Sequence, residues 1–269
     1  MPFLHLDDAD IYYETYGEGV PFLFLSGTAT HGEVWKRHQV PEFSRDHRVI
    51  IFDQRSTGKT KTRSAELSTN QLADDAAALL QHLGADNAVV LGHSMGGRVA
   101  QLLMLDHPTM VGKAILASTG ASFPGRGIPL KMCVELVEKG YECYVREHSL
   151  EVGFTPEFIG ANRAVVEEFL AVRLANPPSL EAFLRLVIAR QATDTSARLK
   201  DIRVPTLVMV GDAEGQADAS GISHASSSEL LAREIPHATL VVVPGQGHYY
   251  PYVDPQTTHR AIRRFLAAA

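Results

Sequence analysis

Short apolar segments alternate with helical patterns over most of the chain, which predicts a layered α/β protein. Residues 3–6 and 10–16 flank a turn and have the pattern of an antiparallel hairpin. The apolar segments after this hairpin are continuous, as in strands that are buried on both faces. We expect these strands at residues 20–25, 47–53, 88–91, 113–118, 205–211 and 239–243. The sheet should therefore begin mixed and continue parallel.

Apolar residues recur at helical spacing between these strands. Ser68, with Gln71 three residues later, has the pattern of a capping box before one helix, and Asp254 is placed to cap the last helix. Further core helices are expected over 33–44 and 229–234.

The pattern is helical throughout between the strands at 113–118 and 205–211. Helices are predicted over 130–146, 156–175 and 179–192, with Gly and Pro residues between them. An all-helical segment between two parallel strands predicts an insertion on an α/β core. We divide the chain into a core, residues 1–121 and 197–269, and a helical insertion, residues 122–196.

The composition fits one large core, because 45% of the 269 residues are hydrophobic. The net charge is −6 and the basic residues are scattered, which argues against a nucleic-acid partner. The first residues lack the pattern of a signal peptide, and no apolar run is long enough to span a bilayer. We expect a cytoplasmic monomer or homodimer with a small-molecule substrate and no membrane partner. Cys133 and Cys143 should be buried, reduced thiols.

The strongest chemical signal is the turn at residues 92–97, between an apolar strand and a helical pattern. Ser94 lies at its apex, and Gly92 and Gly96 stand two residues before and after it. A serine on such a turn has a strained backbone that costs about 1–3 kcal/mol. The two glycines make the turn possible because they have no side chains to collide. The turn would expose the Ser94 hydroxyl at the carboxyl end of the strand, where the next helix points its positive end.

This strand, turn and helix resemble the nucleophile turn of the α/β-hydrolase superfamily, and the resemblance extends over the whole chain. In size, in its helical insertion and in the stretch from the turn through residues 204–207, the chain is most similar to the 3-oxoadipate enol-lactonase and small esterase branch. The resemblance implies the α/β-hydrolase fold, a mostly parallel sheet with helices on both faces. It also implies that residues 122–196 form an all-helical lid, where substrate choice resides.

A catalytic triad in the chain order serine, acid, histidine is implied by the same resemblance. Ser94 would be the nucleophile. His248 would be the base, because it lies in the glycine-rich loop at 244–248 after a predicted strand. His93 also lies beside Ser94 in the sequence, but its side chain should point away from the nucleophile, and we give it no role.

The triad acid is expected in the loop after Gly211. The family pattern places it three positions after that glycine, at Glu214, although aspartate is usual there. Asp218 is an alternative because the loop is longer than in the family. Asp212 is a second alternative because it lies nearer the strand end.

The family also implies an oxyanion hole formed by two backbone N–H groups, here those of Thr28 and Met95. Ser26 and Gly27 stand where the family commonly has His-Gly. His31 and the glycine after it could be the displaced motif, but they lie farther from the strand end.

The predicted function is hydrolysis of a small carboxylic ester or lactone, including an enol-lactone, through an acyl-enzyme. No metal or organic cofactor is expected. Two alternatives remain: a carbon–carbon bond hydrolase of a vinylogous diketone, and a non-hydrolytic or binding member of the same fold. The insertion contains arginines that glutamates nearly balance, so most should lie on a solvated face, while one could bind a substrate carboxylate. They include Arg126, Arg146, Arg163, Arg173, Arg185 and Arg190.

Overall fold

The computed structural model describes residues 2–64, 66–123, 129–215 and 223–268. Within these residues nine strands form one sheet in the order β1-β2-β4-β3-β6-β7-β8-β9, with β5 paired to β2. The strands are β1 (Phe3–His5), β2 (Ala9–Tyr16), β3 (Val20–Leu25), β4 (His47–Phe52), β5 (Lys61–Thr62), β6 (Ala88–His93), β7 (Val111–Ala117), β8 (Thr206–Gly211) and β9 (Ala238–Val243). Strand β2 pairs antiparallel with its neighbours, and the pairs from β4 to β9 are parallel. The predicted mixed edge and parallel centre are confirmed.

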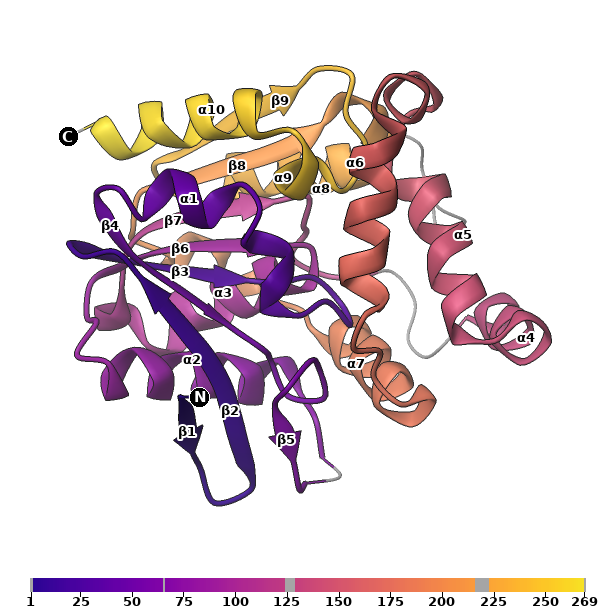
Figure 1. Cartoon of the computed structure of the whole chain (residues 1–269). Coiled ribbons are helices and arrows are strands. Elements are labelled where there is room, and N and C mark those ends of the chain that lie inside the picture. Colours follow the sequence, from indigo (N-terminus) through magenta and orange to yellow (C-terminus); the bar gives the residue numbers. More distant parts are fainter. Residues whose placement is uncertain (1, 65, 124–128, 216–222, 269) are drawn as a thin grey trace.

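Helices cover both faces of the sheet because successive strand residues point to opposite sides. On β3, Leu23 and Leu25 join the apolar layer that contains α2 and α3, whereas Phe22 and Phe24 join the layer that contains α1 and α10. Figure 1 shows these two pairs of helices on opposite sides of the central strands. The core helices are α1 (Gln39–Phe43), α2 (Thr69–His82), α3 (Met95–Asp106), α8 (His224–Glu234), α9 (Tyr250–Val253) and α10 (Pro255–Ala267).

The helical insertion follows β7 and precedes β8. It comprises α4 (Leu130–Lys139), α5 (Tyr141–Gly153), α6 (Pro156–Leu174) and α7 (Leu180–Ala192). Figure 1 shows these helices grouped at one end of the sheet. Backbone N–H groups of His248 and Tyr249 donate to the carbonyls of Val152 (3.2 Å) and Gly153 (3.1 Å), so the end of α5 is bonded to the loop after β9.

Three predictions about the helices and thiols were wrong. The helix expected over 33–44 is a 3₁₀ turn, η1 (Gly32–Trp35), followed by the short α1, where Pro41 lacks an N–H to donate. The helix expected over 130–146 is divided between α4 and α5, because Gly140 has φ 77°. Cys143 is exposed and Cys133 is half-buried, although both are free thiols as expected.

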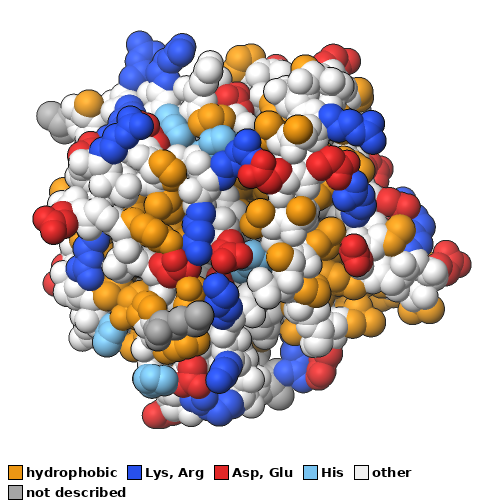
Figure 2. All heavy atoms as spheres, in the orientation of Figure 1, with side chains coloured by type: hydrophobic (Ala, Val, Ile, Leu, Met, Phe, Trp, Pro, Cys, Tyr) orange, Lys and Arg blue, Asp and Glu red, His pale blue; other side chains and the backbone are white. Residues whose placement is uncertain are grey.

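The surface in Figure 2 has acidic and basic side chains interspersed with apolar ones, and this face carries no extended basic stripe. None of the described helices is long and apolar enough to span a membrane.

Candidate active site

Ser94 occupies the strained turn that the sequence predicts. Its backbone has φ 56° and ψ −116°, outside the helical region, and α3 begins at the next residue. Close backbone packing requires glycine at the positions two residues before and after Ser94. A Cβ on Gly92 would lie 2.3 Å from the Gly96 carbonyl oxygen, and a Cβ on Gly96 would lie 2.2 Å from the Leu25 carbonyl oxygen. The turn is thus pressed against the end of β3.

The end of β7 also holds the Ser94 backbone. The Ser94 N–H donates to the Ala117 carbonyl at 2.9 Å. The Ser94 carbonyl accepts from the Thr119 hydroxyl at 2.7 Å. The ends of β3 and β7, the strands on either side of β6, therefore fix the position of Ser94, which follows β6.

His248 and Glu214 form a buried hydrogen-bonded pair. Nδ1 of His248 donates to Oε2 of Glu214 at 2.7 Å. The other carboxylate oxygen, Oε1, accepts from the Ser118 hydroxyl at 2.6 Å and from the Gly211 N–H at 2.9 Å. Because both oxygens have donors, the orientation of the carboxylate is fixed before any ligand binds.

Burial lowers the pKa of His248 to about 3, and the positive charges of Arg173, His148 and Arg190 act in the same direction. The imidazole is therefore neutral near neutral pH. With its proton on Nδ1, toward Glu214, its Nε2 has a free lone pair that can accept a proton.

His93 connects the turn to the histidine loop, although sequence reasoning gave it no role. Its Nε2 donates to the His248 carbonyl at 2.8 Å, and its Nδ1 accepts from the Tyr252 hydroxyl at 3.0 Å. The same hydroxyl accepts from the Gly27 N–H at 3.4 Å. This buried chain links the loop after β3, the residue before Ser94 and the backbone of His248. The one signal in the sequence for this role of His93 was the presence of a histidine at the end of an otherwise apolar strand.

Of the other two candidate carboxylates, Asp212 makes no contact with His248 among the described residues. Asp212 is exposed, and its Oδ1 accepts from the Gln246 N–H at 3.2 Å, which holds the backbone of the histidine loop. Asp218 lies outside the described residues. Among the described residues, Glu214 is therefore the one candidate acid that lies beside the imidazole.

Thr28 and Met95 lie on the two segments packed against Ser94. Met95 is buried at the first position of α3, where a helix leaves its N–H groups without internal partners. Thr28 is half-buried in a tight turn in which the Thr30 N–H donates to the Gly27 carbonyl at 3.2 Å. The alternative at His31 points elsewhere, because its Nε2 donates to the Val172 carbonyl in α6 at 2.9 Å.

Two arginines of the insertion lie near this site and have no acidic partner in the part of the chain that the structure describes. Arg173 is buried and donates to the Tyr249 hydroxyl. Arg190 is half-buried, and its Nη1 lies 3.4 Å from the Thr28 hydroxyl. Neither Nε atom has a hydrogen-bond partner among the described residues.

Three of the other insertion arginines lie at the surface, as the composition predicted. Arg146 pairs with Glu167 and Arg185 pairs with Glu181, both at the surface. Arg163 is exposed, and Arg126 lies outside the described residues.

Comparison with known proteins identifies the fold family. The pattern of the alpha/beta hydrolase family matches residues 22–261. The chain belongs to the alpha/beta hydrolase family. Its relatives include a protein of Azorhizobium caulinodans named as a carbamate hydrolase, 33% identical over 270 residues and covering 98% of both chains. They also include 3-oxoadipate enol-lactonase 2 of Acinetobacter baylyi, 27% identical over 99% of this chain and 98% of that protein.

A solved structure described as an N-acyl homoserine lactone degrading enzyme superposes with a TM-score of 0.81. It is 29% identical in sequence, and the match covers 98% of this chain and 100% of that chain. The family and fold predicted from the sequence are thus confirmed.

The packing of the turn predicts that Gly96→Ala is strongly destabilising. The new Cβ would collide with the backbone of Leu25, which cannot move without displacing β3, so we expect a loss of about 1–3 kcal/mol or more in the free energy of unfolding. Urea denaturation would measure it. Gly160→Ala in α6 is the matched control, because a Cβ there meets nothing within 4 Å. A Gly96→Ala variant as stable as Gly160→Ala would contradict the packing argument.

Proposed function

We propose that this alpha/beta hydrolase is a serine hydrolase that cleaves a small carboxylic ester or lactone through an acyl-enzyme. The observation that carries the proposal is the buried His248–Glu214 pair, tied through His93 to the strained turn of Ser94. A serine at its ordinary pKa is a weak nucleophile and needs a neutral base that is held in one tautomer. This arrangement meets that need.

In the proposed reaction the Ser94 hydroxyl attacks the substrate carbonyl while Nε2 of His248 accepts its proton. Glu214 keeps the other ring proton on Nδ1 and stabilises the imidazolium that forms. The backbone N–H groups of Met95 and Thr28 bind the developing oxyanion. His248 then gives its proton to the leaving group. Water, deprotonated by the same imidazole, finally releases the acid, and this sequence requires no metal or organic cofactor.

The relatives support an acyl substrate. A carbamate, an enol-lactone and a homoserine lactone, which appear in their names, each contain a carbonyl carbon that a serine can attack. We also propose that the helical insertion acts as a lid that selects the substrate. Its support is the contact of Arg190 with Thr28 and of the end of α5 with the histidine loop.

The two arginines that lack an acidic partner among the described residues favour a substrate that carries a carboxylate. A buried guanidinium without an acidic partner is costly, and a bound anion would offset that cost. Arg190 is the better candidate because it reaches the loop that carries Thr28. The carboxylate of the substrate would then bind close to Thr28, in the same part of the site as the proposed oxyanion hole.

Replacing Ser94 by alanine should abolish hydrolysis of short p-nitrophenyl esters and simple lactones, assayed without added metal. The loss in kcat should be on the order of 10⁶-fold if the triad acts as a unit. Thermal stability should stay unchanged or rise as the turn relaxes. Ser196→Ala, at an exposed serine, is the control. More than a tenth of wild-type activity in pure Ser94→Ala would overturn the proposal.

The wild-type assay also separates the alternatives. Turnover of a ring-cleavage dienone, with esters ignored, would favour carbon–carbon cleavage. Absence of activity on all substrates would favour a non-hydrolytic member of the family.

The acid is tested by preparing Glu214→Gln, Asp212→Asn and Asp218→Asn side by side. An amide in place of the acid can stabilise the wrong imidazole tautomer, which costs about 10⁴-fold in kcat in the well-studied serine proteases. We expect that scale of loss for Glu214→Gln and small changes for the other two. If Glu214→Gln is the mild variant, the assignment is wrong and the variant with the large loss identifies the acid.

The role of Arg190 is tested with the mono-p-nitrophenyl ester of glutaric acid and with neutral p-nitrophenyl butyrate. Arg190→Gln should raise KM for the anionic ester by about 10-fold or more, since hydrogen bonds to charged groups contribute roughly 1.5–3 kcal/mol. KM for the neutral ester should change little. Arg146→Gln is the control, because Arg146 already pairs with Glu167. An equal change for both esters would show that Arg190 does not bind the carboxylate.

A further inference from the structure

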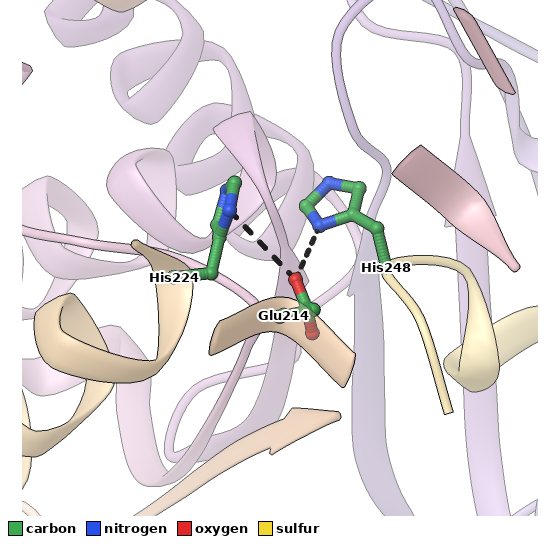
Figure 3. A group of neighbouring side chains, drawn as sticks. All are labelled: Glu214, His224 and His248. Atoms are coloured by element: carbon green, nitrogen blue, oxygen red, sulfur yellow. Dashed lines mark hydrogen bonds and ion pairs between the residues drawn. The ribbon is translucent and has the colours of Figure 1, made fainter. Parts of the chain in front are cut away.

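A second histidine shares the carboxylate that His248 contacts. Nδ1 of His224 lies 3.8 Å from Oε2 of Glu214, and the His224 and His248 rings are 4.5 Å apart between centroids. Figure 3 shows both imidazoles converging on the same oxygen, one from α8 and one from the loop after β9. The proposed triad has no use for His224. Among the described residues this is the one group of three such side chains close enough to hold a metal ion.

The donor set suits a borderline transition metal. Two imidazoles and one carboxylate are ligands that Zn²⁺ binds readily, whereas Mg²⁺ and Ca²⁺ prefer oxygen ligands. The three ligand atoms all lie within 4.8 Å of one another. Tetrahedral Zn²⁺ with bonds of about 2.0–2.1 Å would hold its ligands about 3.4 Å apart. The 2.7 Å contact of His248 would lengthen and the 3.8 Å contact of His224 would shorten, each by less than an ångström.

The surroundings hold two of the ligands and leave the third accessible. The side chains of Glu214 and His248 are 3% and 11% exposed, whereas that of His224 is 42% exposed. Oε1 of Glu214 keeps its bonds to Ser118 and Gly211, so the carboxylate is already oriented. His224 is the first residue of α8, whose start is fixed by a capping box at Ser223.

We propose that Glu214, His224 and His248 form a binding site for Zn²⁺ and that the bound ion switches the base off. Zn²⁺ would take the lone pair of Nδ1 of His248, so the single proton of the neutral ring must move to Nε2. An Nε2 that carries a proton donates, and it cannot accept the proton of Ser94. The metal would also neutralise the carboxylate that stabilises the imidazolium. The binding site stands independently of the proposed hydrolysis, and only the inhibition rests on it.

Binding is tested by calorimetric titration of chelator-treated protein with Zn²⁺. Wild type should bind one ion, and Mg²⁺ should give no binding at this site. His224→Gln should weaken Zn²⁺ binding by more than about 100-fold, since even outer partners of metal ligands contribute about 10–100-fold. His107→Gln should bind like wild type, because His107 pairs with Asp74 at 2.7 Å without a second histidine. Failure of wild type to bind, or equal binding by His224→Gln, would overturn the site.

Inhibition is tested on the same proteins with p-nitrophenyl butyrate. Zn²⁺ should inhibit wild type and His107→Gln, with activity restored by a chelator. Without Zn²⁺, His224→Gln should match wild type, because 3.8 Å is too long for a hydrogen bond to Glu214. The activity of His224→Gln should also stay unchanged when Zn²⁺ is added. Binding that depends on His224 without inhibition would overturn the switch, and binding without any ester turnover in metal-free protein would overturn the proposed function alone.

Discussion

The packing of the turn at Ser94 against the ends of β3 and β7 is the constraint on which the rest of the site depends. Gly92 and Gly96 allow backbone contacts so close that no side chain would fit at either position. Through these contacts the loop after β3, which carries Thr28, is pressed against the turn at Ser94 and the start of α3. The strain of the turn, about 1–3 kcal/mol, is offset by hydrogen bonds from its neighbours. The strands thus locate Ser94 more firmly than its own loop could.

Buried polar groups extend this rigidity to the other side of the site. The chain from Gly27 through Tyr252 and His93 to the His248 carbonyl gives every member a partner. Such fully bonded networks are rigid, because breaking one bond leaves a buried group unsatisfied. Glu214 is held in the same way by Ser118 and Gly211. His248 is therefore held at two points. Its backbone carbonyl is bonded to His93, and its imidazole is bonded to the carboxylate of Glu214.

The insertion gives the site its electrostatic character. Arg173 and Arg190 place positive charge near His248, and with burial they keep its imidazole neutral. The core supplies the opposite charge through Glu214. A substrate carboxylate bound to Arg190, as proposed, would reduce the effect of that arginine on the pKa of His248 and would couple substrate binding to the basicity of the imidazole. In this way a segment without any proposed triad residue can influence the chemistry.

The sequence by itself determined the layered α/β fold, the turn at 92–97 and the helical insertion, because each has a local signal. Apolar runs specify buried strands, glycines specify close backbone packing, and helical periodicity specifies the insertion. Breaks inside helices were harder to predict, since Gly140 permits several local conformations and Pro41 can stand in the first turn of a helix as well as end one. Only the tertiary structure placed Glu214 beside His248 and Asp212 at the surface. It likewise revealed the contacts of His93 and His224. These contacts join residues that are distant in sequence, and their approach is decided by the path of whole loops, which no local pattern encodes.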